Sequence, residues 1–208
     1  MECPPLTPCR IAEYLAGLTL VGSSDYCQDS EVSPVRFRAL LIALTLCIAA
    51  PWAAAQSTTV FVVRHAEKTA EPADDPELSS AGHARAEALA GALADAGIDA
   101  IISTQYRRTR DTVAPLARRI GKPVEVIEWQ RGDVATQAES LAHRIGRQHA
   151  GQQVLVAGHS NTVPAIVAAL SGHSIRPISE QTYGQLFIVQ LDGHSPGRLI
   201  RARFGTAP

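Results

Sequence analysis

Two short apolar runs constrain the fold of this 208-residue chain more than any other feature. Val60–Val63 and Val154–Ala157 are rich in valine and interrupted by no polar residue, which is typical of strands buried on both faces of a parallel sheet. Arg64-His65 follows the first run and His159-Ser160 follows the second. Because ligands bind beyond the carboxyl ends of strands in open α/β sheets, we expect both imidazoles in one crevice. The alternative is a strand that stops at a charged surface loop.

The remaining segments alternate between helical and strand-like patterns, which indicates an α/β fold. We expect three layers, with a mainly parallel sheet flanked by helices and a C-terminal β-hairpin. Ser79 or Ser80 is the expected N-cap of the first helix. A capping box at Thr136–Glu139 predicts the start of the third helix. The expected helices cover residues 80–96, 106–120, 136–150 and 162–171, and the other strands cover 100–102, 124–127, 185–191 and 198–204.

Residues 35–55 have the layout of a secretory signal peptide. Arg36 and Arg38 precede an apolar run at 39–50, and the small residues Ala53-Ala54-Ala55 precede Gln56. An uncleaved membrane anchor is the alternative. Since signal peptides begin a chain, we hypothesise that translation starts near Val35 and that residues 1–34 are a non-native upstream extension. We therefore expect a domain at 56–208, periplasmic or secreted after cleavage near Ala55, with no stable membrane anchor.

Charge and cysteine content exclude several classes of protein. The net charge of −1 and pI of about 6.6 show neither the basic excess of a nucleic-acid binder nor the acidic excess of a disordered chain. All four cysteines lie at or before Cys47, so the body of the chain can form no disulfide within itself. No cysteine or histidine spacing is typical of a metal site, so we expect neither metal nor cofactor. The oligomeric state is left open.

The chemistry-bearing residues together predict an anion site. Arg108 falls early on the helix expected at 106–120, and a helix N-terminus with Arg64 and Arg108 suits phosphate oxygens. Positive neighbours lower the pKa of His65, leaving a lone pair that can attack phosphorus. Arg107 takes the place of Arg108 if the helical register is off by one; otherwise it belongs to a charged surface.

This set of residues resembles the histidine phosphatase superfamily, which is phosphoglycerate mutase-like in fold. The resemblance implies that His65 is the nucleophile that becomes a phosphohistidine, with Arg64, Arg108 and His159 completing the phosphate pocket. Two residues depart from the family pattern: Ala66 replaces the usual glycine and Thr109 the usual alanine. The motifs that carry the resemblance are Arg64-His65-Ala66-Glu67, Leu78-Ser79-x-x-Gly82-x-x-Arg85-Ala86, Ser103-Thr104 through Arg108 to Thr112, and Gly158-His159-Ser160.

The resemblance also implies a small phosphorylated substrate, with Glu67 and Lys68 as further substrate-binding candidates. Lys68 as a merely exposed side chain is the alternative. An alkyl phosphate needs its leaving oxygen protonated, and Asp133 is the first candidate for this general acid, with Glu128 and Glu67 behind it. Glu139 is better explained as a helix cap.

Four other functions remain open. A phosphoglycerate mutase is disfavoured by the short body and the expected export, and a phosphohistidine phosphatase would need no dedicated acid. Gly158–Thr162 nearly matches the G-x-S-x-G elbow of a serine esterase, with Ser160 as nucleophile and Asp192 and His194 following in order. A non-catalytic binder of phosphorylated ligands is the last alternative.

Overall fold

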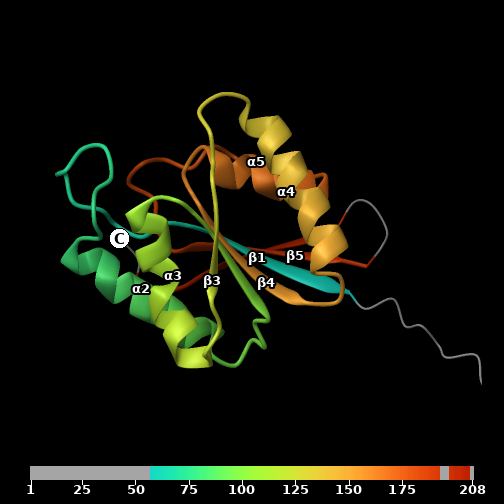
Figure 1. Cartoon of the computed structure of the whole chain (residues 1–208), viewed down its shortest axis with the longest axis horizontal. Helices are drawn as coiled ribbons and strands as arrows, with labels where there is room; N and C mark the ends of the chain where they lie inside the picture. Colours follow the sequence, from blue (N-terminus) through green and yellow to red (C-terminus); the bar gives the residue numbers. More distant parts are fainter. Residues whose placement is uncertain (1–56, 193–196, 207–208) are drawn as a thin grey trace, which may run out of the picture. The chain divides into compact units, whose positions relative to one another are not determined.

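The computed structural model describes residues 57–192 and 197–206. The segments predicted to be an upstream extension (1–34) and a signal peptide (35–55), together with His194, lie outside these described residues. Within the described ranges, no helix has the length and apolar character that crossing a bilayer requires. The elements in chain order are β1 (Thr58–Arg64), α2 (Ser80–Leu93), β2 (Ala100–Thr104), α3 (Arg107–Ile120), β3 (Val124–Ile127), α4 (Val134–Gln148), β4 (Gln153–Gly158), α5 (Thr162–Ser171), β5 (Gln185–Leu191) and β6 (Arg198–Arg203) (Figure 1).

The strands form one six-stranded sheet in the order β3-β2-β4-β1-β5-β6. The first four strands of that order run parallel, β5 is antiparallel to β1, and β6 is antiparallel to β5. The predicted mainly parallel sheet with a C-terminal pair of antiparallel strands is therefore confirmed. Arg64 at the end of β1 lies opposite Gly158 at the end of β4, and Ser103 of β2 lies opposite Ala157. The carboxyl ends of three strands thus meet at one edge.

Alternate residues of the central strands face two separate cores, because successive side chains of a strand point to opposite faces. Val60 and Val62 pack in one core with α4 and α5, whereas Phe61 and Val63 pack in the other with α2 and α3. Figure 1 shows the two helix pairs on opposite sides of the sheet. The predicted three layers are confirmed, and both faces of β1 are buried, as its apolar sequence requires.

Two helix boundaries differ from the prediction. Helix α2 begins after the expected cap, since the Ser79 hydroxyl accepts from the Gly82 N–H, but it ends at Leu93 rather than near residue 96. The capping box predicted for the third helix is wrong. Asp133 is the N-cap of α4, and its carboxylate accepts from the backbone N–H groups of Ala135 and Thr136. A carboxylate placed before the first turn satisfies two free donors, so the helix starts earlier.

Candidate active site

The two histidines expected in one crevice lie side by side. His65 follows β1 and His159 follows β4, and their ring centroids are 5.4 Å apart. The backbone N–H of His65 donates to the Gly158 carbonyl at 2.9 Å, and this bond continues the parallel β1–β4 pairing by one residue. Both side chains are buried, His65 at 3% exposed and His159 at 8%. The sheet register therefore brings together two imidazoles that are far apart in the sequence.

One nitrogen of His65 is available for chemistry. Its Nδ1 lies 2.7 Å from the Ala66 carbonyl oxygen, and a carbonyl only accepts, so Nδ1 carries the proton of the neutral ring. The lone pair is then on Nε2. Burial, with a smaller contribution from the positive charges of Arg64 and Arg108, lowers the pKa of His65 to about 4, although the Ala66 carbonyl and Glu180 act in the opposite direction. The ring is therefore neutral at physiological pH, as the sequence predicted, although burial is the larger cause.

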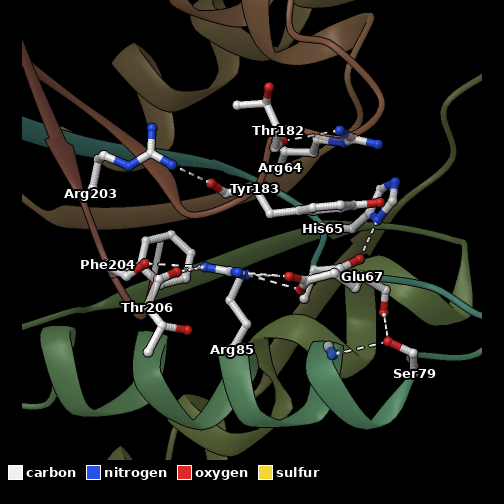
Figure 2. A network of polar contacts seen from close by, with 12 residues as sticks. Arg64, His65, Glu67, Ser79, Arg85, Thr182, Tyr183, Arg203, Phe204 and Thr206 are labelled. Atoms are coloured by element: carbon white, nitrogen blue, oxygen red, sulfur yellow. Dashed lines mark hydrogen bonds and ion pairs between the residues drawn. The ribbon is translucent and has the colours of Figure 1, made fainter. Parts of the chain in front are cut away.

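Arg64 reaches from the end of β1 to the loop before β5. Its Nη1 donates to the carbonyls of Ser179 and Thr182 at 2.7 and 3.1 Å, and its Nη2 donates to Glu180 Oε2 at 2.6 Å. The guanidinium also stacks on the Tyr183 ring, 4.4 Å from its centroid, as Figure 2 shows beside His65. These contacts hold the cation rigidly next to the nucleophile candidate.

Arg108 supplies the second guanidinium, from the first turn of α3. Its side chain is 15% exposed and lies over the Tyr106 ring, 4.4 Å from the centroid, with Asp75 Oδ1 at 3.8 Å. Arg107 is 45% exposed and pairs with Glu77 at the surface. The expected register is confirmed, because Arg108 and not Arg107 turns towards the histidines.

His159 is held by the neighbouring strand β2. Its Nε2 lies 3.0 Å from Thr104 Oγ1, and the Tyr106 ring meets it edge-on at 5.1 Å. Burial, together with smaller effects of Arg108, His65 and Arg64, lowers the pKa of His159 to about 3. A cavity of about 310 Å³ opens beside this ring, and its lining includes Tyr106, Arg108, Trp129, Arg131, His159 and Asn161.

Glu180 is a site residue that sequence reasoning missed. Its carboxylate pairs with Arg64 through one oxygen and accepts from the Ser160 hydroxyl through the other. The hydrogen bond from Ser160 lowers the pKa of Glu180, and the charges of Arg64, His65 and Lys68 lower it too. These effects outweigh burial, which raises the pKa, so the carboxylate is ionised. The only available signal was the long polar loop at 172–184, since nothing in that loop's own sequence ties it to β1.

A family model described as the histidine phosphatase superfamily (branch 1) matches residues 60–131, which contain Arg64, His65 and Arg108. That segment is about a third of the chain, and over it the sequence matches the histidine phosphatase superfamily. The match supports an enzyme of the phosphatase or mutase type. No curated protein sequence matches the chain.

Solved structures share the histidine phosphatase fold at low sequence identity. The protein histidine phosphatase SixA complexed with tungstate is 22% identical, with a TM-score of 0.58, covering 70% of this chain and 96% of its own. A putative phosphohistidine phosphatase SixA from Agrobacterium tumefaciens is 24% identical, with a TM-score of 0.54 and coverages of 71% and 97%. A mycobacterial glucosyl-3-phosphoglycerate phosphatase is 17% identical, with a TM-score of 0.55 and coverages of 73% and 100%.

Glu67 is engaged by a partner outside the Arg64, His65, Arg108 and His159 cluster. Arg85 of α2 donates Nε and Nη2 to its carboxylate at 2.7 to 2.9 Å, and the same guanidinium donates Nη1 to the carbonyls of Phe204 and Thr206 (Figure 2). Burial would raise the pKa of Glu67, but the Arg85 hydrogen bonds lower it. Its predicted roles in substrate binding and as an acid are therefore not supported. Lys68 is exposed and near enough to Glu180 to lower its pKa.

Asp133 is also a poor general acid. It is fully exposed, and hydrogen bonds from Thr136, more than any other contact, lower its pKa, so its carboxylate is held ionised as a helix cap. Glu128 is exposed at the start of the connection between β3 and α4. A polar residue near a site can equally terminate a helix, and only the backbone path distinguishes the two roles.

The serine-esterase alternative lacks a base for its nucleophile in the described chain. Ser160 directs its hydroxyl to the Glu180 carboxylate, not to an imidazole. His159, its neighbour, uses Nε2 on Thr104. In the residues that the structure describes, no group of three or more His, Cys, Asp or Glu side chains could hold a metal ion.

Proposed function

We propose that this protein is a phosphomonoester hydrolase that works through a covalent phosphohistidine on His65. The observation that carries the proposal is the hydrogen bond from His65 Nδ1 to the Ala66 carbonyl, which leaves the Nε2 lone pair free in a neutral ring. A nucleophile of this kind must be unprotonated at working pH and held next to its electrophile. His159 and two guanidiniums lie beside it, which suits a transferring phosphoryl group.

Arg64, Arg108 and His159 are the proposed ligands of the phosphoryl oxygens. The Nε–H groups of Arg64 and Arg108 are buried, and neither has a hydrogen-bond partner in the described chain. A buried unpaired donor costs roughly 1–3 kcal/mol, more for a charged group, so a protein retains it where a ligand satisfies it. Two unpaired guanidinium donors next to one neutral imidazole favour an anionic ligand over a neutral one.

The reaction divides into two displacements at phosphorus. In the first, His65 Nε2 attacks phosphorus and the bond to the leaving oxygen breaks, that oxygen taking a proton. In the second, water attacks phosphorus, the N–P bond breaks and the imidazole is released. Glu180 is the carboxylate whose charge acts on His65, and because it is ionised it suits the second step, accepting the proton that the attacking water loses.

Phosphohistidine hydrolysis is a second candidate activity. Asp133, the first candidate for proton donation, has a lowered pKa, and so does Glu180 beside Arg64, so neither is a ready acid for an alkoxide leaving group. A phosphoramidate releases an imidazole, which needs less help from an acid. The SixA structures that share this fold carry that activity in their names, and the same leaving group is the one this site handles most easily.

A substrate panel tests the proposed function. Purified protein spanning residues 56–208 is assayed with aryl phosphates, sugar phosphates, phosphoglycerates and a phosphohistidine peptide. We expect His65→Ala to lose at least about 10³-fold in kcat/KM, or about 4 kcal/mol of transition-state stabilisation. Rapid quenching should trap acid-labile phosphorus on His65. Ser160→Ala should retain turnover, because Ser160 is not the proposed nucleophile. A serine esterase that used Ser160 would lose its activity in this variant. Near-normal activity in His65→Ala would overturn the nucleophile assignment.

We also propose export, with the enzyme acting in the periplasm or outside the cell on small phosphorylated compounds. Support comes from the pattern of residues 35–55 alone. Mass spectrometry of the protein from fractionated cells tests it. We expect a mature N-terminus near Gln56 in the exported fraction, and abundant peptides from residues 1–34 would contradict the proposed upstream extension.

A further inference from the structure

We infer that Thr109 is a positioning residue that determines which nitrogen of His159 carries the proton. Thr109 replaces the alanine usual in the family, and its side chain is completely buried. Its Oγ1 lies 2.8 Å from Thr104 Oγ1, which in turn lies 3.0 Å from His159 Nε2. Thr104 is 2% exposed, so the three side chains form a hydrogen-bonded row closed to solvent.

The direction of this row follows from counting protons, since each threonine hydroxyl has one to donate. The Thr109 hydroxyl has two carbonyl oxygens within reach, those of Tyr106 at 2.8 Å and Thr104 at 3.2 Å. Carbonyls only accept, so the Thr109 proton goes to them. Thr109 Oγ1 must then accept from the Thr104 hydroxyl. The opposite arrangement, with Thr109 donating to Thr104 Oγ1, would give up both carbonyl bonds.

Thr104 has now used its only proton, so its oxygen accepts from His159. The neutral His159 ring therefore carries its proton on Nε2 and its lone pair on Nδ1. Without Thr109, the Thr104 hydroxyl would have no acceptor on α3 and would turn its proton to His159 Nε2. The ring would then carry its own proton on Nδ1. One hydroxyl on α3 thereby selects the tautomer of a histidine on the far side of β2.

The tautomer matters for anion binding. An Nδ1 lone pair repels a phosphoryl oxygen, so His159 must gain a proton there before it can donate to an oxyanion. The charged and titratable groups near the ring are Arg64 and His65 at the end of β1, Tyr106 and Arg108 at the start of α3, and Arg131, which lines the same cavity. Arg64 and Arg108 oppose protonation of the empty site, and an entering dianion removes that opposition. Anion binding should therefore take up a proton.

Nuclear magnetic resonance of ¹⁵N-histidine-labelled protein tests the inference directly. The His159 signals are assigned by their loss in His159→Gln. We expect the wild-type ring at pH 7 to be the Nε2–H tautomer. Thr109→Val keeps the shape and removes the hydroxyl, and should change His159 to the Nδ1–H tautomer. Thr109→Ser should restore the wild-type pattern. Thr58→Val, which removes a buried hydroxyl 5% exposed at the start of β1, is the matched control and should leave His159 unchanged.

Calorimetry with tungstate gives a second readout. Titrations in two buffers of different ionisation enthalpy measure the protons taken up per tungstate bound. We expect about one proton in the wild type and in Thr109→Ser, and clearly less in Thr109→Val, whose neutral ring already presents an Nδ1–H. A wild-type Nδ1–H tautomer, or an unchanged tautomer in Thr109→Val, would overturn the inference.

The role of the His159 tautomer in catalysis rests on the proposed function, but the tautomer itself does not. The inference and the proposed function can therefore fail separately. The wild-type spectrum needs no variant and no turnover, so it is informative even if Thr109→Val does not fold. An Nε2–H tautomer with Thr109 dependence but no phosphatase turnover would overturn the proposed function alone. Turnover with an Nδ1–H wild-type ring would overturn the role of Thr109 alone.

Discussion

Neighbouring side chains in the segment after β1 serve different parts of the molecule. Arg64 and His65 lie at the proposed phosphate site, whereas Glu67 pairs with Arg85 of α2, which also contacts the segment after β6 (Figure 2). A family motif read along the chain does not separate these roles. Substitution of single residues does, because the loss of a charge partner lowers stability and the loss of a reacting group lowers turnover.

Glu67→Gln should mainly affect stability. The Arg85 side chain is 7% exposed and would keep a buried charge without its partner, so we expect a loss of about 2–4 kcal/mol in the free energy of unfolding, measured by urea. The kcat/KM of the folded variant should change little. Glu77→Gln is the control, because its pair with Arg107 is about half exposed and worth under about 1 kcal/mol. Equal losses in both variants would contradict the structural role of Glu67.

The pH dependence of turnover should reflect the lowered pKa of His65. The value of about 4 lies below the ordinary 6.5, so the ring keeps its lone pair as the pH falls from 7 to 5. We expect kcat/KM limited by this group to fall about tenfold per pH unit only below about pH 4. Steady-state kinetics with an aryl phosphate measures this pH dependence. A fall in kcat/KM centred on pH 6.5 would show that the pKa of His65 is not lowered.

Circular dichroism at each pH is the necessary control, because the folded chain loses stability as the pH falls. Both histidines have depressed pKa values in the folded chain, about 4 and about 3, so between those values and 6.5 the unfolded chain binds more protons. Their contribution to stability is present above pH 6.5 and is lost as the pH falls through the folded values. Kinetic data are therefore compared only where the chain remains folded.

At the scale of elements, helix α2 is positioned by a close approach of backbones. A Cβ added to Gly82 would overlap the Glu67 carbonyl oxygen, and the Glu67 carbonyl also accepts from the Ser79 N–H at 2.9 Å. The start of α2 therefore packs directly on the segment that follows His65. The glycine is required for its lack of a side chain and not for an unusual backbone angle.

Gly82→Ala and Gly91→Ala form a matched pair on one helix. We expect Gly82→Ala to lower the free energy of unfolding by at least about 2 kcal/mol, because backbone atoms must move apart. At Gly91 the nearest atom to an added Cβ is 4.0 Å away, so alanine should raise stability by about 0.5–1 kcal/mol through helix propensity. Thermal unfolding measures both. A stabilising Gly82→Ala would refute the close packing of α2 on the motif.

Substitutions at Asp133 distinguish its role as the N-cap of α4 from a role as the general acid. Asparagine is as good a cap as aspartate but cannot donate a carboxyl proton. We expect Asp133→Asn to keep both stability and kcat/KM, and Asp133→Ala to lower the stability of the folded chain with kcat/KM kept. Urea unfolding and steady-state assays are run on both variants. A loss of turnover in Asp133→Asn would reinstate this carboxyl as the general acid.

At the scale of the whole described chain, the proposed phosphate site is formed by the order of strands in the sheet. Arg64, Arg108 and His159 come from segments that follow three parallel strands, and they adjoin only because β1, β4 and β2 are neighbours. The unfolded chain therefore has no equivalent site. An anion that binds here must stabilise the folded state by mass action.

Tungstate should raise the stability of the folded chain by about 2.7 kcal/mol at a hundred times its Kd. We expect most of this gain to disappear in Arg108→Gln, because the variant removes one of two guanidiniums at the site. Arg118→Gln is the control on the same helix, since that side chain is 70% exposed and distant from the site. Thermal unfolding with and without tungstate measures the effect. A gain that persists in Arg108→Gln would place the anion elsewhere.

Sequence reasoning predicted interactions between residues close in the chain better than interactions between distant residues. The helix cap at Ser79 and the register of Arg108 depend on spacings of a few residues, and both were predicted. Asp133 was given a chemical role because the family resemblance implies a carboxylate in the region after the second strand–helix unit, whereas its carboxylate caps its own helix. Glu180 was missed because it contacts Arg64, 116 residues earlier in the chain.

The sequence by itself determined the layered α/β fold and the presence of Arg64, His65 and His159 beyond two buried strands, because alternation and apolar runs decide which faces a strand buries. Only the tertiary structure decided which partner each polar side chain takes: Arg85 for Glu67, Arg64 for Glu180 and Thr104 for His159. Such pairings depend on distances of about 3 Å between residues on different elements. A sequence specifies those distances only through the packing of the whole sheet and its helices.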